Sequence, residues 1–146
     1  MWKFRSMIAS AEEQQAELSS RNVYGDEPLF KVPHDPRITS LGSFLRRTSL
    51  DELPQFWNVL RGDMSLVGPR PPLPDEVARY APRHYIRLDV RPGLTGPWQV
   101  SGRNRIMHFE DVVALESAYI AEWSFARDAI ILARTLPAVI RMDGAL

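Results

Sequence analysis

The chain has 146 residues, of which 45% are hydrophobic and 25% charged, and this composition fits one globular domain and excludes wholesale disorder. Eighteen basic residues balance eighteen acidic ones, so no net field attracts the chain to nucleic acid, and we expect no nucleic-acid partner. The chain has no cysteine, which excludes a disulfide framework and a thiolate metal site.

Signals for membrane insertion are absent from the sequence as given. No stretch approaches the roughly 20 apolar residues of a membrane-spanning helix. The charged start of the chain also lacks the apolar core of a signal peptide. We therefore expect this chain alone to be soluble or peripheral on a membrane.

The first part of the chain predicts one polar helix followed by irregular structure. Residues 6–21 are rich in Ala, Glu and Gln and carry a weak apolar stripe, which predicts a helix that packs on another element. Glycine and proline then recur over residues 22–38, which indicates irregular chain around a short extended piece at residues 29–32.

Two helices are predicted next, over residues 39–47 and 49–60, each with apolar residues at helical spacing. The second begins with Ser49, Asp51 and Glu52 in the order of a capping box. In that structural interpretation Glu52 bonds the backbone of Ser49, and Asp51 complements the helix dipole. The alternative is a functional carboxylate pair.

Loops and two more helices complete the predicted fold. Proline and glycine make residues 64–74 a stiff loop, residues 75–85 predict a short helix broken by proline, and residues 90–102 predict a turn-rich loop with a strand near 98–100. Amphipathic helices fit residues 109–122 and 124–141. The fold class is thus mainly α with short β elements (α+β), in a single compact domain over residues 1–146 with Pro/Gly-rich loops around the active site.

Arginine dominates the basic residues and points to phosphate. Sixteen of the 18 basic residues are arginine, and arginine offers a planar fork for bidentate phosphate contacts. We favour phosphate contacts for Arg47, which precedes the carboxylate pair, and for Arg70, which two prolines hold in the stiff loop. Arg91 and Arg103 flank a glycine-containing stretch that suits a nucleotide or sugar. The alternative for each of the four is solvated surface or a structural turn.

A series of motifs resembles the bacterial sugar transferases, the monotopic phosphoglycosyl transferases that move a sugar phosphate from a nucleotide sugar to a polyprenyl phosphate. The motifs, in order, are KFRSM (3–7), DPRIT (35–39), RRTSLDELPQ (46–55), GDMSLVGPRP (62–71), RPGLTG (91–96), WS (123–124) and GAL (144–146). Several motifs in the right order are far more specific than any one of them. Family members carry a hydrophobic membrane helix upstream of the first motif, and we expect that segment to lie outside this sequence.

The resemblance implies that Asp51 and Glu52 are the catalytic pair. Asp51 would attack the β-phosphorus of a nucleotide diphosphate sugar, and Glu52 would hold Mg²⁺ as the cofactor. Asp128 is a further candidate metal ligand, although it also fits an ordinary first-turn acid of the last helix. Because adjacent residues on a helix diverge by about 100°, we expect the two carboxylates to do separate jobs. The family usually has aspartate where this chain has Glu116.

The function expected from the resemblance is initiation of exopolysaccharide or other cell-surface glycan synthesis at the cytoplasmic face of the bacterial inner membrane. Its partners would be a nucleotide diphosphate sugar, a polyprenyl phosphate and the membrane surface. The alternative is a truncated, non-catalytic domain that binds nucleotide or partner chains. Apolar faces on residues 6–21 and 124–141, where Phe125, Ile131 and Leu132 need cover, would favour homo-oligomers.

Overall fold

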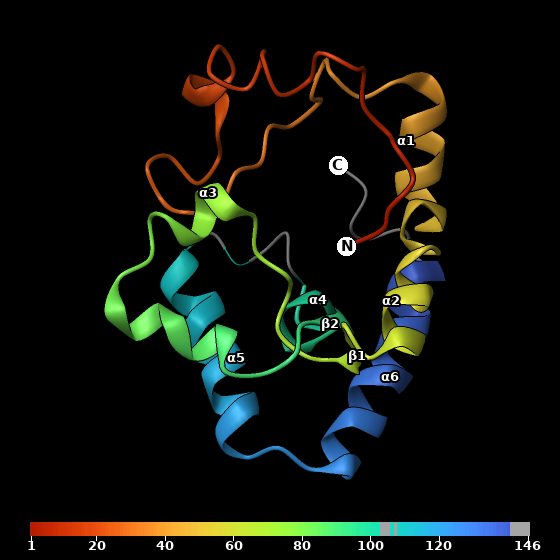
Figure 1. Ribbon diagram of the computed structural model, residues 1–146, viewed down its shortest axis with the longest axis vertical. Coiled ribbons are helices and arrows are strands. Elements are labelled where there is room, and N and C mark those ends of the chain that lie inside the picture. Colours follow the sequence, from red (N-terminus) through yellow and green to blue (C-terminus); the bar gives the residue numbers. More distant parts are fainter. Residues whose placement is uncertain (103–105, 107, 141–146) are drawn as a thin grey trace.

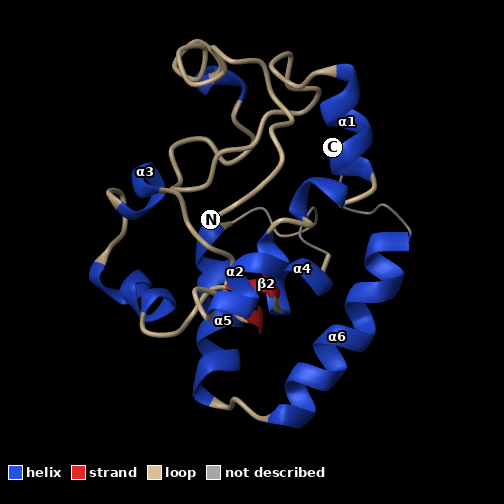
Figure 2. Cartoon of the chain, turned by 45° about the vertical axis from the view of Figure 1, so that its right-hand side comes forward, coloured by secondary structure: helices blue, strands red, loops and turns tan. Residues whose placement is uncertain are grey.

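The computed structural model describes residues 1–102, 106 and 108–140 (Figure 1). Its elements in chain order are η1 (Ser19–Arg21), α1 (Ser40–Arg47), η2 (Leu50–Glu52), α2 (Gln55–Arg61), β1 (Ser65–Val67), α3 (Pro74–Val77), η3 (Pro82–Leu88), β2 (Gly93–Thr95), α4 (Pro97–Val100), α5 (Phe109–Ala121) and α6 (Phe125–Ile140), where η marks a 3-10 helix. Helices and loops make up nearly all of the chain, and the short strands lie in its middle (Figure 2). The mainly α fold with short β elements is confirmed.

A two-stranded parallel sheet lies at the centre of the molecule. Strand β1 pairs with β2 in the register Ser65↔Gly93 and Val67↔Thr95. The strands come so close that a Cβ on Gly93 would lie 2.1 Å from the backbone nitrogen of Gly68, so only glycine fits there. The sequence predicted a strand near residues 98–100, and this prediction was wrong. Those residues belong to α4, and the strand lies earlier in the same segment.

Two apolar clusters cover the sheet and its flanking helices. The smaller contains Val67, Tyr119 and Ile131, and therefore ties β1 to α5 and α6. The larger consists of the side chains Tyr24, Leu29, Tyr80, Trp98, Phe109, Val112 and Val113. In Figure 1 the sheet lies between α5 on one side and α2 with α6 on the other. The prediction that Ile131 needs cover was wrong, because this side chain is already buried in the smaller cluster.

The predicted helix over residues 6–21 was wrong. That stretch is a series of turns that ends in η1, and its backbone bonds run mainly from i to i−3, as in Gln15 N–H to the Glu12 carbonyl at 3.1 Å. Its start pairs instead with the DPRIT segment, because Ile8 N–H bonds the Arg37 carbonyl at 2.9 Å and Met7 bridges Ile38. Helix propensity is a weak prior that such tertiary pairing overrides.

The predicted helix over residues 49–60 is two elements. Ser49 has a left-handed backbone with φ of 56°, so it ends the preceding helix rather than capping a new one, and its side chain makes no capping bond. A single 3-10 turn, η2, follows, and Pro54 precedes α2. The capping-box interpretation is therefore wrong, whereas the helix predicted over residues 39–47 is confirmed as α1 with Thr39 as its cap.

Large apolar side chains lie exposed along α1, η2 and α2, which follow one another along one side of the molecule (Figure 1). These exposed residues, hereafter the α1–α2 apolar residues, are Leu41, Phe44, Leu50, Leu53, Phe56, Trp57 and Leu60. The sequence placed such surface on residues 6–21 and 124–141. The second expectation is confirmed, because α6 exposes Phe125, Ile130, Leu132, Leu136 and Val139, whereas the described large apolar side chains of residues 6–21 are not exposed. No helix in the described part of the chain has the length and apolar character needed to cross a bilayer.

Candidate active site

A cleft of about 500 Å³ opens between the start of the chain and the central loops. One wall is the N-terminal segment, and the opposite wall brings together Arg46, Glu52, Arg70 and the strand residue Gly93. Three segments that are far apart in sequence therefore meet here. The cleft is lined by Glu52 of the acidic pair and by arginines, and Asp51 directly precedes Glu52 in the chain.

Asp51 and Glu52 converge on one ammonium group. The Lys3 Nζ atom lies 3.0 Å from Asp51 Oδ2 and 3.2 Å from Glu52 Oε1. The neighbouring residue Phe4 donates its N–H to the Asp51 carbonyl at 3.0 Å, so the N-terminal segment holds Asp51 by backbone and side chain. The Asp51 side chain is only 3% exposed, while that of Glu52 lies partly open to the cleft. The expected divergence of the two carboxylates is not observed.

Two carboxylate oxygens of the pair converge on one cationic group. The Lys3 ammonium marks a point where two carboxylate oxygens and a positive charge already meet, and carboxylate oxygens are the ligands that Mg²⁺ takes from proteins. Among the described residues no group of three or more His, Asp or Glu side chains could hold a metal ion. The residues could therefore hold Mg²⁺ only in the manner of sites that complete the octahedron with water and substrate phosphate.

Arg46, rather than Arg47, faces the cleft. The Arg46 side chain is half-buried and donates from Nε to Ser6 Oγ at 2.8 Å. Burial lowers the pKa of Arg46, and the nearby charge of Asp51 opposes that effect. Arg47 lies exposed and is not among the residues that line the cleft. Sequence reasoning gave no role to Lys3, whose only signal was its place in the KFRSM motif.

Arg70 reaches the cleft from the stiff loop after β1, as the sequence predicted for its position. Its Nη1 atom lies 3.1 and 3.0 Å from the two carboxylate oxygens of Glu76, and its guanidinium stacks over the Trp98 ring at 5.7 Å. The side chain keeps 31% of its surface exposed. The guanidinium is thus fixed in place and still accessible from the cleft.

The remaining predicted site residues lie elsewhere. Asp128 accepts hydrogen bonds from Tyr119 Oη at 2.6 Å and Trp123 Nε1 at 3.2 Å, and it is not among the residues that line the cleft. The structure therefore does not bring it together with Glu52. Arg91 is exposed and outside the cleft lining, and Arg103 falls outside the described residues.

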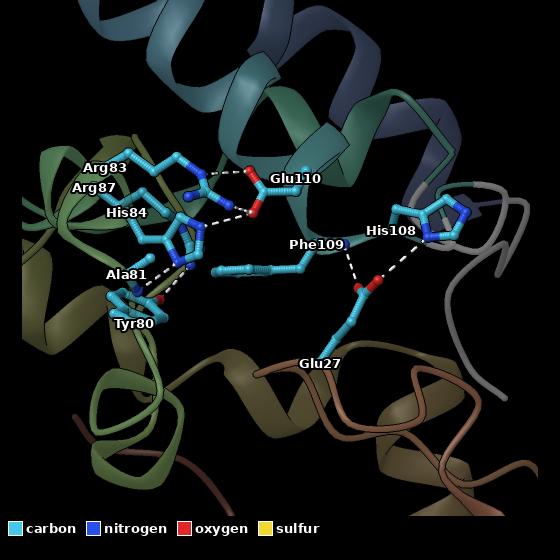
Figure 3. Close-up of polar contacts among 9 residues, drawn as sticks. All are labelled: Glu27, Tyr80, Ala81, Arg83, His84, Arg87, His108, Phe109 and Glu110. Atoms are coloured by element: carbon cyan, nitrogen blue, oxygen red, sulfur yellow. Dashed lines mark hydrogen bonds and ion pairs between the residues drawn. The ribbon is translucent and has the colours of Figure 1, made fainter.

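A second polar cluster fastens η3 to the start of α5 (Figure 3). Glu110 accepts from Arg83 Nη2 at 2.5 Å and contacts His84 Nε2 at 2.9 Å, while Ala81 N–H donates to His84 Nδ1 at 3.0 Å. These bonds, that from Arg83 first, lower the pKa of Glu110 to about 2 from its ordinary 4.5. The sequence gave the histidines no role, and His84 here is a structural group that joins two elements.

Comparisons with known proteins identify the relatives of this chain. The sequence profile of the family described as bacterial sugar transferase matches residues 1–142. Galactosyl transferase CpsE of Streptococcus agalactiae is 49% identical over 144 residues, which is 99% of this chain and 32% of that protein. The undecaprenyl-phosphate galactose phosphotransferase of Salmonella typhimurium is 47% identical over 147 residues, which is 99% of this chain and 31% of that protein.

A shorter relative shows the same coverage of this chain. The exopolysaccharide production protein ExoY of Rhizobium meliloti is 42% identical over 146 residues, which is 98% of this chain and 64% of that protein. The chain therefore spans about a third of the length of the first two relatives and less than two thirds of the third.

Proposed function

Because this chain belongs to the bacterial sugar transferase family, we propose that it carries the transfer of a sugar phosphate from a nucleoside diphosphate sugar to a polyprenyl phosphate. The observation that carries the proposal is the convergence of Asp51 and Glu52 at the cleft, beside a lysine and two arginines. The names of the relatives, which include undecaprenyl-phosphate and galactose, support these substrate classes. Initiation of exopolysaccharide synthesis is the matching cellular role, as the name of ExoY suggests.

The proposed reaction has two displacements at one phosphorus. An Asp51 carboxylate oxygen attacks the β-phosphorus of the donor, and the bond from that phosphorus to the bridging oxygen breaks, which releases the nucleoside monophosphate. The sugar phosphate is then held on Asp51 as an acyl phosphate. An oxygen of the polyprenyl phosphate attacks the same phosphorus, and Asp51 is released as a carboxylate.

The surrounding residues suit this chemistry. Asp51 lies under the Lys3 ammonium, so an incoming phosphate can take over that ammonium as its own partner and reach the carboxylate. Arg46 and Arg70 line the same cleft and can bind the α- and β-phosphate oxygens. Glu52, with its carboxylate beside that of Asp51, would hold Mg²⁺. The ion, when bound, neutralises the diphosphate and stabilises the leaving oxygen.

A membrane surface is the proposed location of the acceptor. The residues next to the acidic pair, Leu50 and Leu53, are exposed, and so are Trp2 and Phe4 on either side of Lys3. Apolar side chains at this place would bring the cleft to the depth where a lipid phosphate lies. We place this surface at the cytoplasmic face of the inner membrane, where nucleotide sugars are made. The alternative of a domain that only binds nucleotide or partner chains is not favoured, because the relatives are named as transferases.

The test is capture of the covalent sugar phosphate. The intact protein is mixed with UDP-galactose alone and analysed by mass spectrometry, and wild-type protein should gain the mass of one sugar phosphate on the peptide that contains Asp51. Asp51→Asn should abolish both the adduct and the transfer, because an amide is a far poorer nucleophile. Asp111→Asn, at an exposed position of α5 outside the cleft, is the matched control and should retain both. Substantial transfer by Asp51→Asn would refute the proposal.

A further inference from the structure

A fully buried ion pair lies behind the wall of the cleft that carries Arg70. Glu116 of α5 is 0% exposed and Arg87 of η3 is 2% exposed. The Arg87 Nε atom donates to Glu116 Oε2, and Arg87 Nη1 donates to Tyr80 Oη. Burial raises the pKa of Glu116, and Arg87 opposes that effect. Neither charge takes part in the proposed reaction.

Both members of the pair hold the backbone of Arg70. Arg70 donates its N–H to the second oxygen of Glu116, Oε1, at 3.0 Å, and Arg87 Nη2 donates to the Arg70 carbonyl at 3.3 Å. Pro69 and Pro71 stand on either side and have no N–H of their own. The peptide groups of Arg70 are therefore fixed from inside the protein, at a place where the loop has few other ways to anchor itself.

A third buried carboxylate holds the side chain of the same residue. Glu76 is 3% exposed, and it accepts from Arg70 Nη1 with both oxygens and from Leu73 N–H at 3.0 Å. The guanidinium is thus held over the ring of Trp98 while the rest of the residue is held by Glu116 and Arg87. Arg70 is the point where these three buried charged groups meet.

Stability alone is a weak explanation for this arrangement. Burying an ion is costly, and well-packed apolar residues commonly replace a buried ion pair at no loss of stability. Apolar residues, however, cannot accept the N–H of Arg70 or donate to its carbonyl. Specifying the position of that one residue is therefore a job that only charged or polar groups can do here.

We propose that Glu116, together with Arg87, is a positioning residue that sets where Arg70 presents its guanidinium to the phosphates of the donor. The inference rests on the proposed function, in which Arg70 binds phosphate. Glu116→Gln is the sharpest variant because its amide puts an NH2 group in place of one carboxylate oxygen, so that either the Arg70 N–H at Oε1 or the Arg87 Nε–H at Oε2 loses its acceptor and meets a donor. Loss of either bond releases one side of the loop.

The experiment is a double-mutant cycle in membranes that contain the intact protein. Initial rates with UDP-galactose and undecaprenyl phosphate give kcat and KM for wild type, Glu116→Gln, Arg70→Ala and the double variant. Glu116→Gln should lower kcat/KM for the donor about 10- to 100-fold, as expected for a misplaced binding group. In the Arg70→Ala background the same change should cost less than about twofold, because the residue it positions is gone.

Glu110→Gln is the matched control. Glu110 also joins α5 to η3 through an arginine, Arg83 (Figure 3). Its side-chain bonds within the described part of the chain go to Arg83 and His84, not to Arg70. Its effect on kcat/KM should be small and the same in both backgrounds. Glu116→Asp, which keeps two oxygens on a shorter stem, should recover part of the loss seen in Glu116→Gln.

The other outcomes are decisive. Equal losses from Glu116→Gln with and without Arg70 would overturn the inference, because a purely structural role is additive. If Glu116→Gln does not accumulate, the cycle is repeated with Arg87→Lys, which keeps the positive charge and loses the planar guanidinium. Failure of both variants to accumulate would also overturn the inference. If Arg70→Ala transfers normally, the positioning role fails while the adduct on Asp51 still tests the proposed transferase. Absence of the adduct refutes the proposed transferase mechanism. The double-mutant cycle is then measured on the affinity for UDP-galactose, determined by calorimetry.

Discussion

The α1–η2–α2 side of the molecule exposes large apolar side chains, whereas the α5–η3 side buries an ion pair. On the first, large apolar side chains such as Phe56 and Leu60 lie exposed, at 48% and 80% of their surface. On the second, Glu116 and Arg87 are buried, and the Arg87 guanidinium lies over the rings of Tyr80 and Phe109. The buried charges hydrogen-bond the backbone of Arg70 in the loop at the cleft, and we propose that the exposed apolar residues contact a partner surface.

The largest expected effect lies at η2, which belongs to the side with exposed apolar residues but does not follow its pattern of burial. This element belongs to the apolar side, yet it carries the buried Asp51 and the half-open Glu52. Removal of divalent ions with EDTA should reduce transfer by several orders of magnitude, and Mg²⁺ should restore it better than Ca²⁺, because the smaller ion holds phosphate oxygens in a tighter octahedron. Glu52→Gln should raise the Mg²⁺ concentration needed for half-maximal rate. Unchanged transfer in EDTA would contradict the role given to Glu52.

The same substitution on the two sides sharpens the comparison. Phe109→Ala removes a ring that packs on Tyr80 and His84 in the larger cluster, and should cost about 3–5 kcal/mol of stability. Phe56→Ala removes a ring that is half-exposed and should cost well under about 1 kcal/mol. Urea denaturation followed by tryptophan fluorescence compares the two. Equal losses would show that Phe56 is covered by the protein itself.

Binding to lipid vesicles tests what the α1–α2 apolar residues are for. Trp57→Ser and Leu60→Ser should each weaken binding to vesicles of anionic phospholipid about tenfold, because each removes roughly 1.4 kcal/mol or more of apolar burial. Their thermal stability in solution should hardly change. Leu136→Ser, which alters a comparably exposed side chain on α6, is the control for a general loss of surface hydrophobicity. Equal weakening by all three variants would argue against a specific surface on α1 and α2.

The smallest expected effect concerns acid stability at η3 and α5. The folded-state pKa of Glu110 is lowered to about 2 from its ordinary 4.5, chiefly by its bond from Arg83. Such a group contributes stability above about pH 4.5, and loses that contribution as pH falls toward 2. Because Glu110 is half-exposed, its contribution should be under about 1 kcal/mol. Melting temperatures of wild type and Glu110→Gln should differ slightly at pH 7 and converge near pH 2; a constant difference would contradict this account.

The sequence was a good guide wherever local pattern and tertiary structure agree. Helix α1 follows its Thr39 cap and its apolar spacing, and the stiff loop with Arg70 follows from its prolines. The helix predicted over residues 6–21 failed because its start pairs with residues 37–39, which no local pattern reveals. The single helix predicted over residues 49–60 was wrong for a related reason, since the left-handed backbone of Ser49 accompanies the contact of Asp51 with Lys3, which is far away in sequence.

In the candidate site, too, the residues marked by local motifs were predicted and those that act through distant contacts were not. Asp51, Glu52 and Arg70 were found from motif and composition, and the structure brings Glu52 and Arg70 to one cleft, with Asp51 directly beside Glu52. Lys3 and the anchoring role of Glu116 were missed because each acts on a residue far away in sequence. Spacing rules identify neighbours on one helix. They do not identify a lysine that reaches a carboxylate from another segment.

The bridge from Lys3 to the acidic pair also has a kinetic consequence. Lys3 and Glu52 are 49 positions apart in the sequence. We therefore expect the bridge to form only after the segment that contains Lys3 has docked on an assembled α1–η2 region. Contacts of such long range tend to be absent from the folding transition state. Weakening the bridge should therefore speed unfolding while leaving the rate of folding nearly unchanged. We therefore expect the acidic pair to acquire its final geometry late in folding, and the lifetime of that geometry to depend on how long Lys3 stays in contact with it.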